Sequence, residues 1–557
     1  MRSMMLLLLI KNMFLKKYFP SWCFNMKQNV QIYDTTLRDG TQAENFNLSV
    51  TDKIRISHKL DELGIDFIEG GWPGSNPLAV EYFKAMQSET LKHAKLSAFG
   101  ATRMFSNPVE KDKTVQALLD SKTSVITIFG KSWDIHVHDA LRIELEDNLL
   151  IIEETLGYLK PHIDQLFYDA EHFFDGFKKN AEYALATLGK AIDGGAECLI
   201  LCDTNGGMLP HEVQPIIERV QRFIQERGAK VSLGIHAHND SETAVANSLL
   251  ALSLGVEQVQ GTMNGYGERC GNANLTSVIP ALGLKMGYEC AAIQNIDKLY
   301  ETAMLVDELA NLPHNKYQPY VGRSAFAHKG GIHVSAVKRN PLCYEHIAPE
   351  KVGNIRRILI SDQAGKSNVI HKAKKFGIDI ETSSPITAAI VAELKELENQ
   401  GFQYEGAEAS FELLMRRAIG VQANYFTLKG FRAINSKRKM DEPPETEATI
   451  RLEVGGEEVH TASMGDGPVN ALDKAIRKAL TRFYPTLEEV ELIDYKVRVL
   501  SGQHGTASRV RVLIESKDNY EQWGTVGVSL NIIEASWQAL VDSINYKLMR
   551  DEKRNTK

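Results

Sequence analysis

Residues 30–42 read VQIYDTTLRDGTQ and residues 231–240 read VSLGIHAHND. In each stretch a short apolar run is followed at once by charged and polar residues. This pattern is typical of a strand in a parallel α/β barrel, because the active site of such a barrel forms at the carboxyl ends of its strands. Similar runs alternate with amphipathic helical stretches at a spacing of roughly 30 residues, as expected of βα units. The sequence therefore predicts a (β/α)₈ TIM barrel with strands at Val30–Tyr33, Phe67–Gly70, Leu96–Gly100, Val125–Phe129, Leu166–Asp169, Cys198–Cys202, Val231–His236 and Gln258–Thr262.

Composition shifts divide the rest of the chain. We expect the barrel domain to span residues 27–295, a mostly helical subdomain to span 296–434, and an α+β domain of a size that folds alone to span 449–557. Residues 435–448 contain a basic run followed by an acidic, proline-bearing run, which is the composition of a solvated linker.

The overall composition favours an ordinary globular protein. The chain has 557 residues, of which 43% are hydrophobic and 24% charged, and a formal net charge of −7. A nucleic-acid or anionic-membrane partner normally requires a basic surplus, which this chain lacks. Its 6 cysteines form no CxxC pair, which fits a reducing compartment. We expect a cytoplasmic protein whose partners are small molecules and other copies of itself.

The first 26 residues differ in composition from the rest of the chain. They hold a short apolar run at Met4–Ile10, three lysines and no acidic residue. The run is too short to span a bilayer, which takes about 20 apolar residues, and no small-residue cleavage site comes after it. Met26 directly precedes the first predicted strand. We interpret residues 1–26 as an extension that is either a targeting segment or, preferably, the product of a start codon assigned too far upstream.

Polar residues collect after six of the predicted strands, where an active site is expected. They are Arg38 and Asp39 after the first strand, Glu69 at the second, Asp169 and Glu171 at the fifth, Thr204 after the sixth, His236 and His238 at the seventh, and Asn272 after the eighth.

Three of these residues form a candidate metal site. His236 and His238 are two residues apart on a strand, so their side chains point to the same side and can offer nitrogens to one cation. Asp39 lies next to them only if the barrel closes, and it would supply a carboxylate. Two histidines and one carboxylate leave positions open for substrate and water, which suits Mg²⁺, Mn²⁺ or Zn²⁺. The alternative is a pair of surface histidines at a strand end.

Other strand-end residues are candidates for substrate binding. The planar fork of Arg38 suits a carboxylate or an enolate oxygen. Glu171 is either an ordinary strand-end carboxylate or a group that holds a metal-bound water or orients Arg38. Thr204 either offers its hydroxyl to a substrate carboxylate or stabilises a turn.

These motifs resemble those of the 2-isopropylmalate, homocitrate and citramalate synthases, the acyl-transfer branch of the DRE-TIM metallolyases. The match rests on Leu37-Arg38-Asp39-Gly40-x-Gln42 with Lys53 after ten further residues, on His236-x-His238-Asn239-Asp240, and on Gly271-Asn272. It covers residues 27 to about 430, and the tail resembles the regulatory domain of these synthases.

The resemblance implies roles for individual residues. Asp39, His236 and His238 would bind the divalent metal, with Asn272 near or on it. Arg38, Glu171 and Thr204 would hold the 2-oxo acid, and His333 would be the catalytic base. Tyr344 matches a tyrosine that reaches the site from the helical region, often across a dimer interface. Members of the family are dimers, so we expect a homodimer.

The chain departs from the family pattern at three positions. Glu242 stands where the second signature usually has glycine, and we expect it to start the following helix without loss of metal binding. Ser335 stands two residues after the predicted base, where an acidic residue is common. Asp169 replaces a tyrosine that some citramalate synthases place in the substrate pocket.

The segments Thr127–His136, Glu69–Asn76 and Tyr344–Ile347 are similar to one branch of citramalate synthases, which use pyruvate. This branch implies condensation of acetyl-CoA with pyruvate and water to give citramalate and CoA, in isoleucine biosynthesis. Asp169, Ser132 and His136 are then further substrate-binding candidates. Trp72 and Trp133 either narrow the pocket or pack outside it. The alternatives are a 2-isopropylmalate or homocitrate synthase with a larger pocket and, remotely, a non-catalytic metabolite sensor.

The C-terminal domain is expected to be regulatory, because the metal and base candidates all precede it. Gly465, Asp466 and Gly467 precede a predicted helix, and backbone N–H groups at a helix N-terminus can receive a carboxylate. The alternative is a plain capping turn. The resemblance makes isoleucine the first effector to consider.

Overall fold

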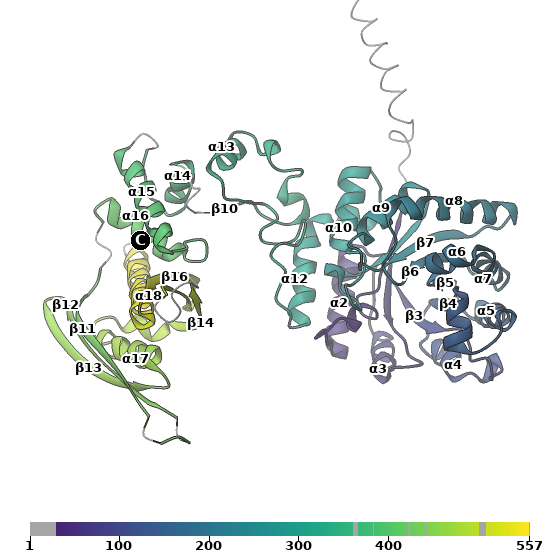
Figure 1. The fold of residues 1–557 in the computed structure, drawn as a ribbon, viewed down its shortest axis with the longest axis horizontal. Helices are drawn as coiled ribbons and strands as arrows, with labels where there is room; N and C mark the ends of the chain where they lie inside the picture. Colours follow the sequence, from purple (N-terminus) through teal and green to yellow (C-terminus); the bar gives the residue numbers. More distant parts are fainter. Residues whose placement is uncertain are drawn as a thin grey trace, which may run out of the picture. The chain divides into compact units, whose positions relative to one another are not determined.

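The computed structural model describes residues 29–359, 366–381, 384–421, 424–437, 439–441, 443–500 and 508–555 (Figure 1). The predicted N-terminal extension, residues 1–26, lies outside these residues. The chain divides into two compact units. Among the described residues, the first comprises those up to Phe326 together with Ile347–Ile355, and the second comprises Ala327–His346 and those from Arg356 onward.

The first unit is built on a closed barrel of eight parallel strands in chain order, which confirms the predicted fold class. The barrel closes where β1 pairs with β8, and Gln31 to Asp34 lie opposite Gln258 to Gly261 along this seam. The strands are β1 (Gln31–Asp34), β2 (Phe67–Gly71), β3 (Lys95–Ala101), β4 (Val125–Lys131), β5 (Gln165–Glu171), β6 (Cys198–Asp203), β7 (Ser232–Ala237) and β8 (Gln258–Gly261).

Side chains fill the barrel interior. Tyr33, Phe67 and Phe167 belong to one buried cluster inside it, and the rings of Phe67 and Phe167 meet edge to face with centroids 5.1 Å apart. This packed layer confines free space to the mouth of the barrel at the carboxyl ends of the strands.

Helices surround the barrel (Figure 1). The first of them, α2, begins with a capping box in which Ser49 and Asp52 bond reciprocally, and it ends at Gly64 in the left-handed conformation. The helices of this unit are α2 (Val50–Leu63), α3 (Pro77–Met86), α4 (Lys113–Asp120), α5 (Leu145–Leu159), α6 (Phe173–Lys179), α7 (Ala181–Asp193), α8 (Pro210–Glu226), α9 (Ala244–Ser253), α10 (Leu275–Ala281), α11 (Ala291–Gln294) and α12 (Leu299–Leu309).

The second unit combines helices with two three-stranded antiparallel sheets, ordered β11-β12-β13 and β14-β15-β16. In the described part of the chain no helix is long and apolar enough to cross a membrane. The elements are β9 (Ala327–His328), α13 (Gly331–Arg339), β10 (Arg357–Ile358), α14 (Lys366–Lys375), α15 (Pro385–Gln400), α16 (Glu408–Ala418), β11 (Thr427–Ser436), β12 (Glu445–Val454), β13 (Glu457–Gly465), α17 (Pro468–Leu480), β14 (Glu491–Val499), β15 (Val510–Lys517), β16 (Gln522–Ser529) and α18 (Ile532–Asn555).

The structure corrects the predicted linker at residues 435–448. These residues include the ends of β11 and β12, which pair from Ser436 opposite Glu445 to Thr427 opposite Glu453 as one hairpin. The charged run falls between the two strands, where a hairpin turn and a linker have the same composition.

The predicted boundary between residues 434 and 449 is also wrong. Ile390 on α15 and Phe411 on α16 share a buried core with Val526 and Val528 on β16. The helices predicted as a subdomain at 296–434 are therefore divided, because α12 contacts α2 beside the barrel whereas α14 to α16 belong to the C-terminal unit. An amphipathic pattern shows that a helix has an apolar face but does not identify what covers it.

Glu242 precedes helix α9 rather than starting it. It lies two residues before Ala244, is exposed, and has φ of 58°, which is the left-handed region. A non-glycine residue costs about 1–2 kcal/mol in this conformation, because its Cβ approaches the following carbonyl oxygen. This backbone geometry is the physical reason for a glycine in the motif at that position.

Replacing Glu242 by glycine should therefore stabilise the protein. The relief of strain, less the extra entropy of glycine in the unfolded chain, leaves roughly 0.5–1 kcal/mol. Denaturant unfolding at pH 7 measures the change, and Glu242→Ala is the matched control because alanine retains the strain. Equal stability of the glycine and alanine variants would contradict the strain argument.

Candidate functional site

Three buried side chains converge at the mouth of the barrel. The Nε2 atoms of His236 and His238 lie 3.3 Å apart, and Asp39 Oδ2 lies 3.6 Å from the first and 3.7 Å from the second. Ligand atoms about 2.0–2.2 Å from a shared cation lie at such separations from one another. The three residues thus form a buried group that could bind a metal.

A glutamine fixes the orientation of His236. Gln260 Nε2 donates to Asp169 Oδ1 at 3.2 Å, so its Oε1 faces His236 Nδ1 at 2.9 Å and accepts a hydrogen bond from it. The proton is therefore on Nδ1 and the lone pair of Nε2 faces the convergence point. Burial lowers the pKa of His238 to about 4, so this ring is also neutral near pH 7.

Asn272 supplies a fourth candidate ligand atom, an amide oxygen, beside Asp39. Its Nδ2 donates to Asp39 Oδ1 at 2.8 Å and to the carbonyl oxygen of Tyr266 at 3.2 Å. Its Oδ1 is buried and has no hydrogen-bond partner among the described residues. A buried acceptor left without a partner beside a carboxylate and two neutral imidazoles fits a divalent cation.

Arg38 is held rigidly beside this group. Its Nε donates to Glu69 Oε2 at 2.5 Å and its Nη1 to Asp39 Oδ2 at 3.0 Å, while its guanidinium stacks 3.8 Å from the centre of the Phe99 ring. Burial raises the pKa of Asp39, but Arg38 and the two histidines outweigh it and lower the value to about 2. Asp39 is therefore a carboxylate at neutral pH.

These groups open into a cavity of about 220 Å³. One wall is aromatic, because the rings of Phe99 and Phe129 stack at 5.1 Å and Trp72 meets Phe129 edge-on at 5.3 Å. The lining residues are Arg38, Asp39, Gln42, Trp72, Phe99, Phe129, Asp169, Glu171, Cys202, Thr204, His236, His238 and Glu268. The structure thus brings most of the predicted barrel residues together.

The polar side of the cavity contains Glu171 and Thr204. Glu171 pairs with Lys131, at the end of the neighbouring strand β4. The Thr204 hydroxyl accepts a hydrogen bond from the backbone N–H of His172 at 2.9 Å, which leaves its own proton to donate.

Two predicted substrate-binding residues lie outside the cavity lining. Ser132 is buried and its hydroxyl accepts from Thr187 on α7 at 3.0 Å, so it packs between the barrel and a helix. The ring of His136 lies against that of His172, tilted by 31° with centroids 4.1 Å apart, and Trp133 packs beside both rings. Ser132 is therefore corrected to a packing residue, and Trp133 packs outside the cavity.

Several residues that support or line the site were given no role by the sequence argument. Glu69, Lys131 and Gln260 hold Arg38, Glu171 and His236 respectively, and Gln42 and Cys202 line the cavity. Their signal was the placement of a polar residue on an inward-facing strand position, as at Gln260, where a side chain that faces a barrel interior is normally apolar.

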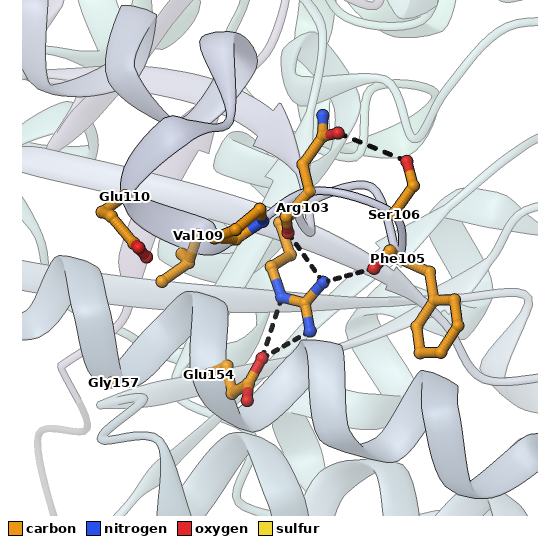
Figure 2. Close-up of a pocket in the computed structure, with 9 residues that line it drawn as sticks. Arg103, Phe105, Ser106, Val109, Glu110, Glu154 and Gly157 are labelled. Carbon is orange, nitrogen blue, oxygen red and sulfur yellow. Dashed lines mark hydrogen bonds and ion pairs between the residues drawn. The ribbon is translucent and has the colours of Figure 1, made fainter.

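A larger hollow of about 580 Å³ lies beside the loop after β3 (Figure 2). Arg103 dominates it, donating to Glu154 and to the carbonyl oxygens of Met104, Phe105 and Asn107. Because the guanidinium of Arg103 is engaged by this loop and by α5, the hollow reflects loop structure and offers no convergent reactive groups.

His333 and Tyr344, the predicted base and its neighbour, lie in the second unit. His333 is on α13, and its ring stacks on Tyr344 with centroids 4.2 Å apart. Both side chains are exposed.

Lys53 ties the loops after two strands together. It lies on α2, is only 3% exposed, and donates to the carbonyl oxygens of Leu37 at 2.7 Å and Gly70 at 3.2 Å. No carboxylate in the described ranges pairs with it, and burial lowers its pKa to about 8. Lys53 thereby fixes the backbone just before Arg38.

The pKa of Lys53 predicts a pH-dependent stability. Between pH 8 and the unfolded value of about 10.4 the native state holds fewer protons than the unfolded state, so stability rises with pH. We compare the free energy of unfolding of the wild type with that of Lys53→Met. The difference, wild type minus variant, should increase by about 2–3 kcal/mol between pH 7 and pH 10. Denaturant titrations measure this difference, with Lys84→Met at an exposed position as control. A constant difference would contradict the burial argument.

Models of three known domain families match the chain. They are HMGL-like at residues 29–306, the homocitrate synthase post-HMGL domain-like family at 320–401, and the LeuA allosteric (dimerisation) domain at 405–548.

Curated relatives match along nearly the whole chain. The (R)-citramalate synthase of Geobacter sulfurreducens is 57% identical over 94% of this chain and 98% of its own length, and that of Aquifex aeolicus is 55% identical over 95% and 99%. The 2-isopropylmalate synthase of Methanocaldococcus jannaschii is more distant, at 30% identity over 95% and 96%.

Proposed function

The chain belongs to the (R)-citramalate synthase family, and we propose that it condenses acetyl-CoA with pyruvate and water to give citramalate and CoA. The observation that carries the proposal is the buried group of Asp39, His236 and His238 beside the fixed fork of Arg38. A metal-binding group and a guanidinium side by side match the carboxylate and keto oxygens of a 2-oxo acid.

Asp39, His236 and His238 would hold a divalent cation, with Asn272 Oδ1 as a further ligand. Such a cation would act as a Lewis acid toward the keto oxygen of the substrate and would neutralise the charge that develops there. Mg²⁺, Mn²⁺ and Zn²⁺ all accept this ligand set.

His238→Ala should lower the affinity for a divalent cation by roughly 100-fold or more, because loss of a direct ligand costs more than loss of an outer partner. Calorimetric titration of Mn²⁺ into metal-stripped protein measures the affinity, and circular dichroism checks the fold. His211→Ala, an exposed histidine on α8, is the matched control. Unaltered Mn²⁺ binding by His238→Ala, or full turnover in metal-stripped buffer, would rule the site out.

Arg38 would bind and orient the substrate carboxylate. Its Nε and Nη1 are engaged by Glu69 and Asp39, whereas Nη2 donates to no acceptor in the described residues. The free edge can therefore meet the carboxylate without reorganisation. Thr204 would donate its hydroxyl proton to the same carboxylate, and Glu171 and Asp169, which also line the cavity, would complete its polar side.

The aromatic wall supports pyruvate as the 2-oxo acid. Trp72, Phe99 and Phe129 pack against one another and bound one side of the 220 Å³ cavity with large rings. One methylene more or less in an apolar pocket changes the discrimination between two substrates by about 1–3 kcal/mol, so a rigid wall can select 2-oxo acids by size.

Release of free CoA over a panel of 2-oxo acids tests this function. Pyruvate should have the highest kcat/KM, and 2-oxobutyrate should be poorer by roughly tenfold or more. Trp72→Ala should narrow that ratio by enlarging the cavity, whereas Trp133→Ala, which packs outside it, should preserve the ratio. A preference of the wild type for 2-oxoisovalerate would contradict the proposal and indicate the activity of an isopropylmalate synthase.

His333 would remove a proton from the methyl group of acetyl-CoA, with Tyr344 packed against its ring. Ile332 and Leu342, on α13 and just after it, are 81% and 77% exposed. Two large exposed apolar side chains beside the proposed base support a surface that a second copy of the chain would cover. A homodimer is therefore part of the proposal. In the CoA assay His333→Ala should lower kcat far more than it raises KM for pyruvate.

The turn between β13 and α17 would bind the effector. Gly467 is the N-cap residue of α17, and the backbone N–H of Asp466 donates to Asn470 Oδ1 at 3.2 Å, so Gly465, Asp466 and Gly467 form the turn at the helix N-terminus. We assign isoleucine to this turn as an inhibitor. CoA release that is unchanged by added isoleucine would remove this part of the proposal.

A further inference from the structure

A buried carboxylate outside the barrel is connected to the candidate metal centre. Asp307 lies on α12, which packs outside the barrel, and its side chain is 2% exposed. It accepts hydrogen bonds from Asn264 Nδ2 at 2.6 Å, from the Tyr266 hydroxyl at 2.6 Å and from His314 Nδ1 at 2.5 Å. Three chain segments are thus joined at one side chain.

Two of these donors belong to the loop that carries Asn272. The loop after β8 holds five residues with positive φ, which are Asn264, Gly265, Gly267, Arg269 and Gly271. Such a backbone is unfavourable for arginine, whereas asparagine adopts it more readily, and contacts from outside help the loop to hold its shape. Asn264 and Tyr266 provide them through Asp307, and Tyr266 also packs on Phe46 with centroids 4.7 Å apart.

Tyr266 passes this constraint to the metal centre. Its carbonyl oxygen accepts from Asn272 Nδ2, which also donates to Asp39. The amide is clamped between the two acceptors, and this clamp points its unpartnered Oδ1 away from both. Gly267 lies against the clamp, because a Cβ there would meet Asn272 Nδ2 at 2.1 Å and Asp39 Oδ1 at 3.2 Å.

We propose that Asp307 is a positioning residue for the metal centre, acting through Tyr266 to hold Asn272 and Asp39 in the geometry that receives a divalent cation. It touches neither substrate nor ligand atoms. The Asp307 carboxylate, on a helix outside the barrel, thereby influences the metal affinity of the site at the barrel mouth. This inference rests on the proposed metal site.

The experiment is calorimetric titration of Mn²⁺ into metal-stripped, full-length protein. Asp307→Asn should raise the dissociation constant about tenfold, the lower end of what outer partners of a metal site contribute. Tyr266→Phe removes only the hydroxyl and should produce a similar rise, and the double variant should be no weaker than either single variant, because both act along one path. Excess Mn²⁺ should restore turnover in each.

Glu308→Gln is the matched control, since Glu308 neighbours Asp307 on the same helix and is exposed. A variant that was only less stable would lose melting temperature and metal-saturated turnover without a change in Mn²⁺ affinity. If Asp307→Asn does not fold, Tyr266→Phe decides the question. Wild-type affinity in the folded variants overturns this inference alone, whereas a wild type that binds no Mn²⁺ overturns the proposed metal site.

Discussion

The whole site depends on closure of the barrel between its first and last strands. The pairing of β1 with β8 brings the loop that holds Asp39 against the loop that holds Asn272, across 233 positions of sequence. The hydrogen bond between these two side chains exists only in the closed ring. Folding the barrel and assembling the site are therefore one event, since the carboxylate has no histidine neighbours until the ring closes.

The buried charges around this seam account for its chemistry. Arg38 lies beside two carboxylates, those of Asp39 and Glu69, while the two histidines face the same space. Burial lowers the pKa of His236, so it adds no positive charge near neutral pH. Burial and the nearby Glu69 carboxylate raise the pKa of Asp169 well above its usual range. One guanidinium cannot offset the acidic groups gathered here, and a buried uncompensated charge is costly. A divalent cation held by Asp39, His236 and His238 would offset this excess of negative charge.

The sequence predicted the strands well, because β-branched runs that end in polar residues are the local signature of a parallel barrel. It also predicted Asp39, His236 and His238, since the period of a strand places alternate residues on one side. Ser132 was placed wrongly because it follows the end of β4, beyond the regular alternation. Gln260 and Lys53 were missed as supports because their partners, His236 and the carbonyls of Leu37 and Gly70, are far away in sequence. The predicted domain boundary was wrong because the apolar faces of α15 and α16 pack against β16, which follows them by more than a hundred residues.

The rigidity of Arg38 has its origin deeper in the barrel. Glu69, which fixes the guanidinium, itself accepts hydrogen bonds from Tyr33 at 2.7 Å and Thr35 at 2.5 Å, and Tyr33 also reaches Thr127 at 2.8 Å. The polar residues of several strands therefore form one network beneath the mouth. Burying these polar groups costs desolvation free energy, but each of them has a hydrogen-bond partner. A buried network whose hydrogen bonds are all made is rigid, and here it restrains Arg38. A fork that is already oriented binds developing negative charge without reorganisation at the moment of reaction. The polar residues inside the barrel are thus explained by their role in fixing the orientation of Arg38 at the barrel mouth.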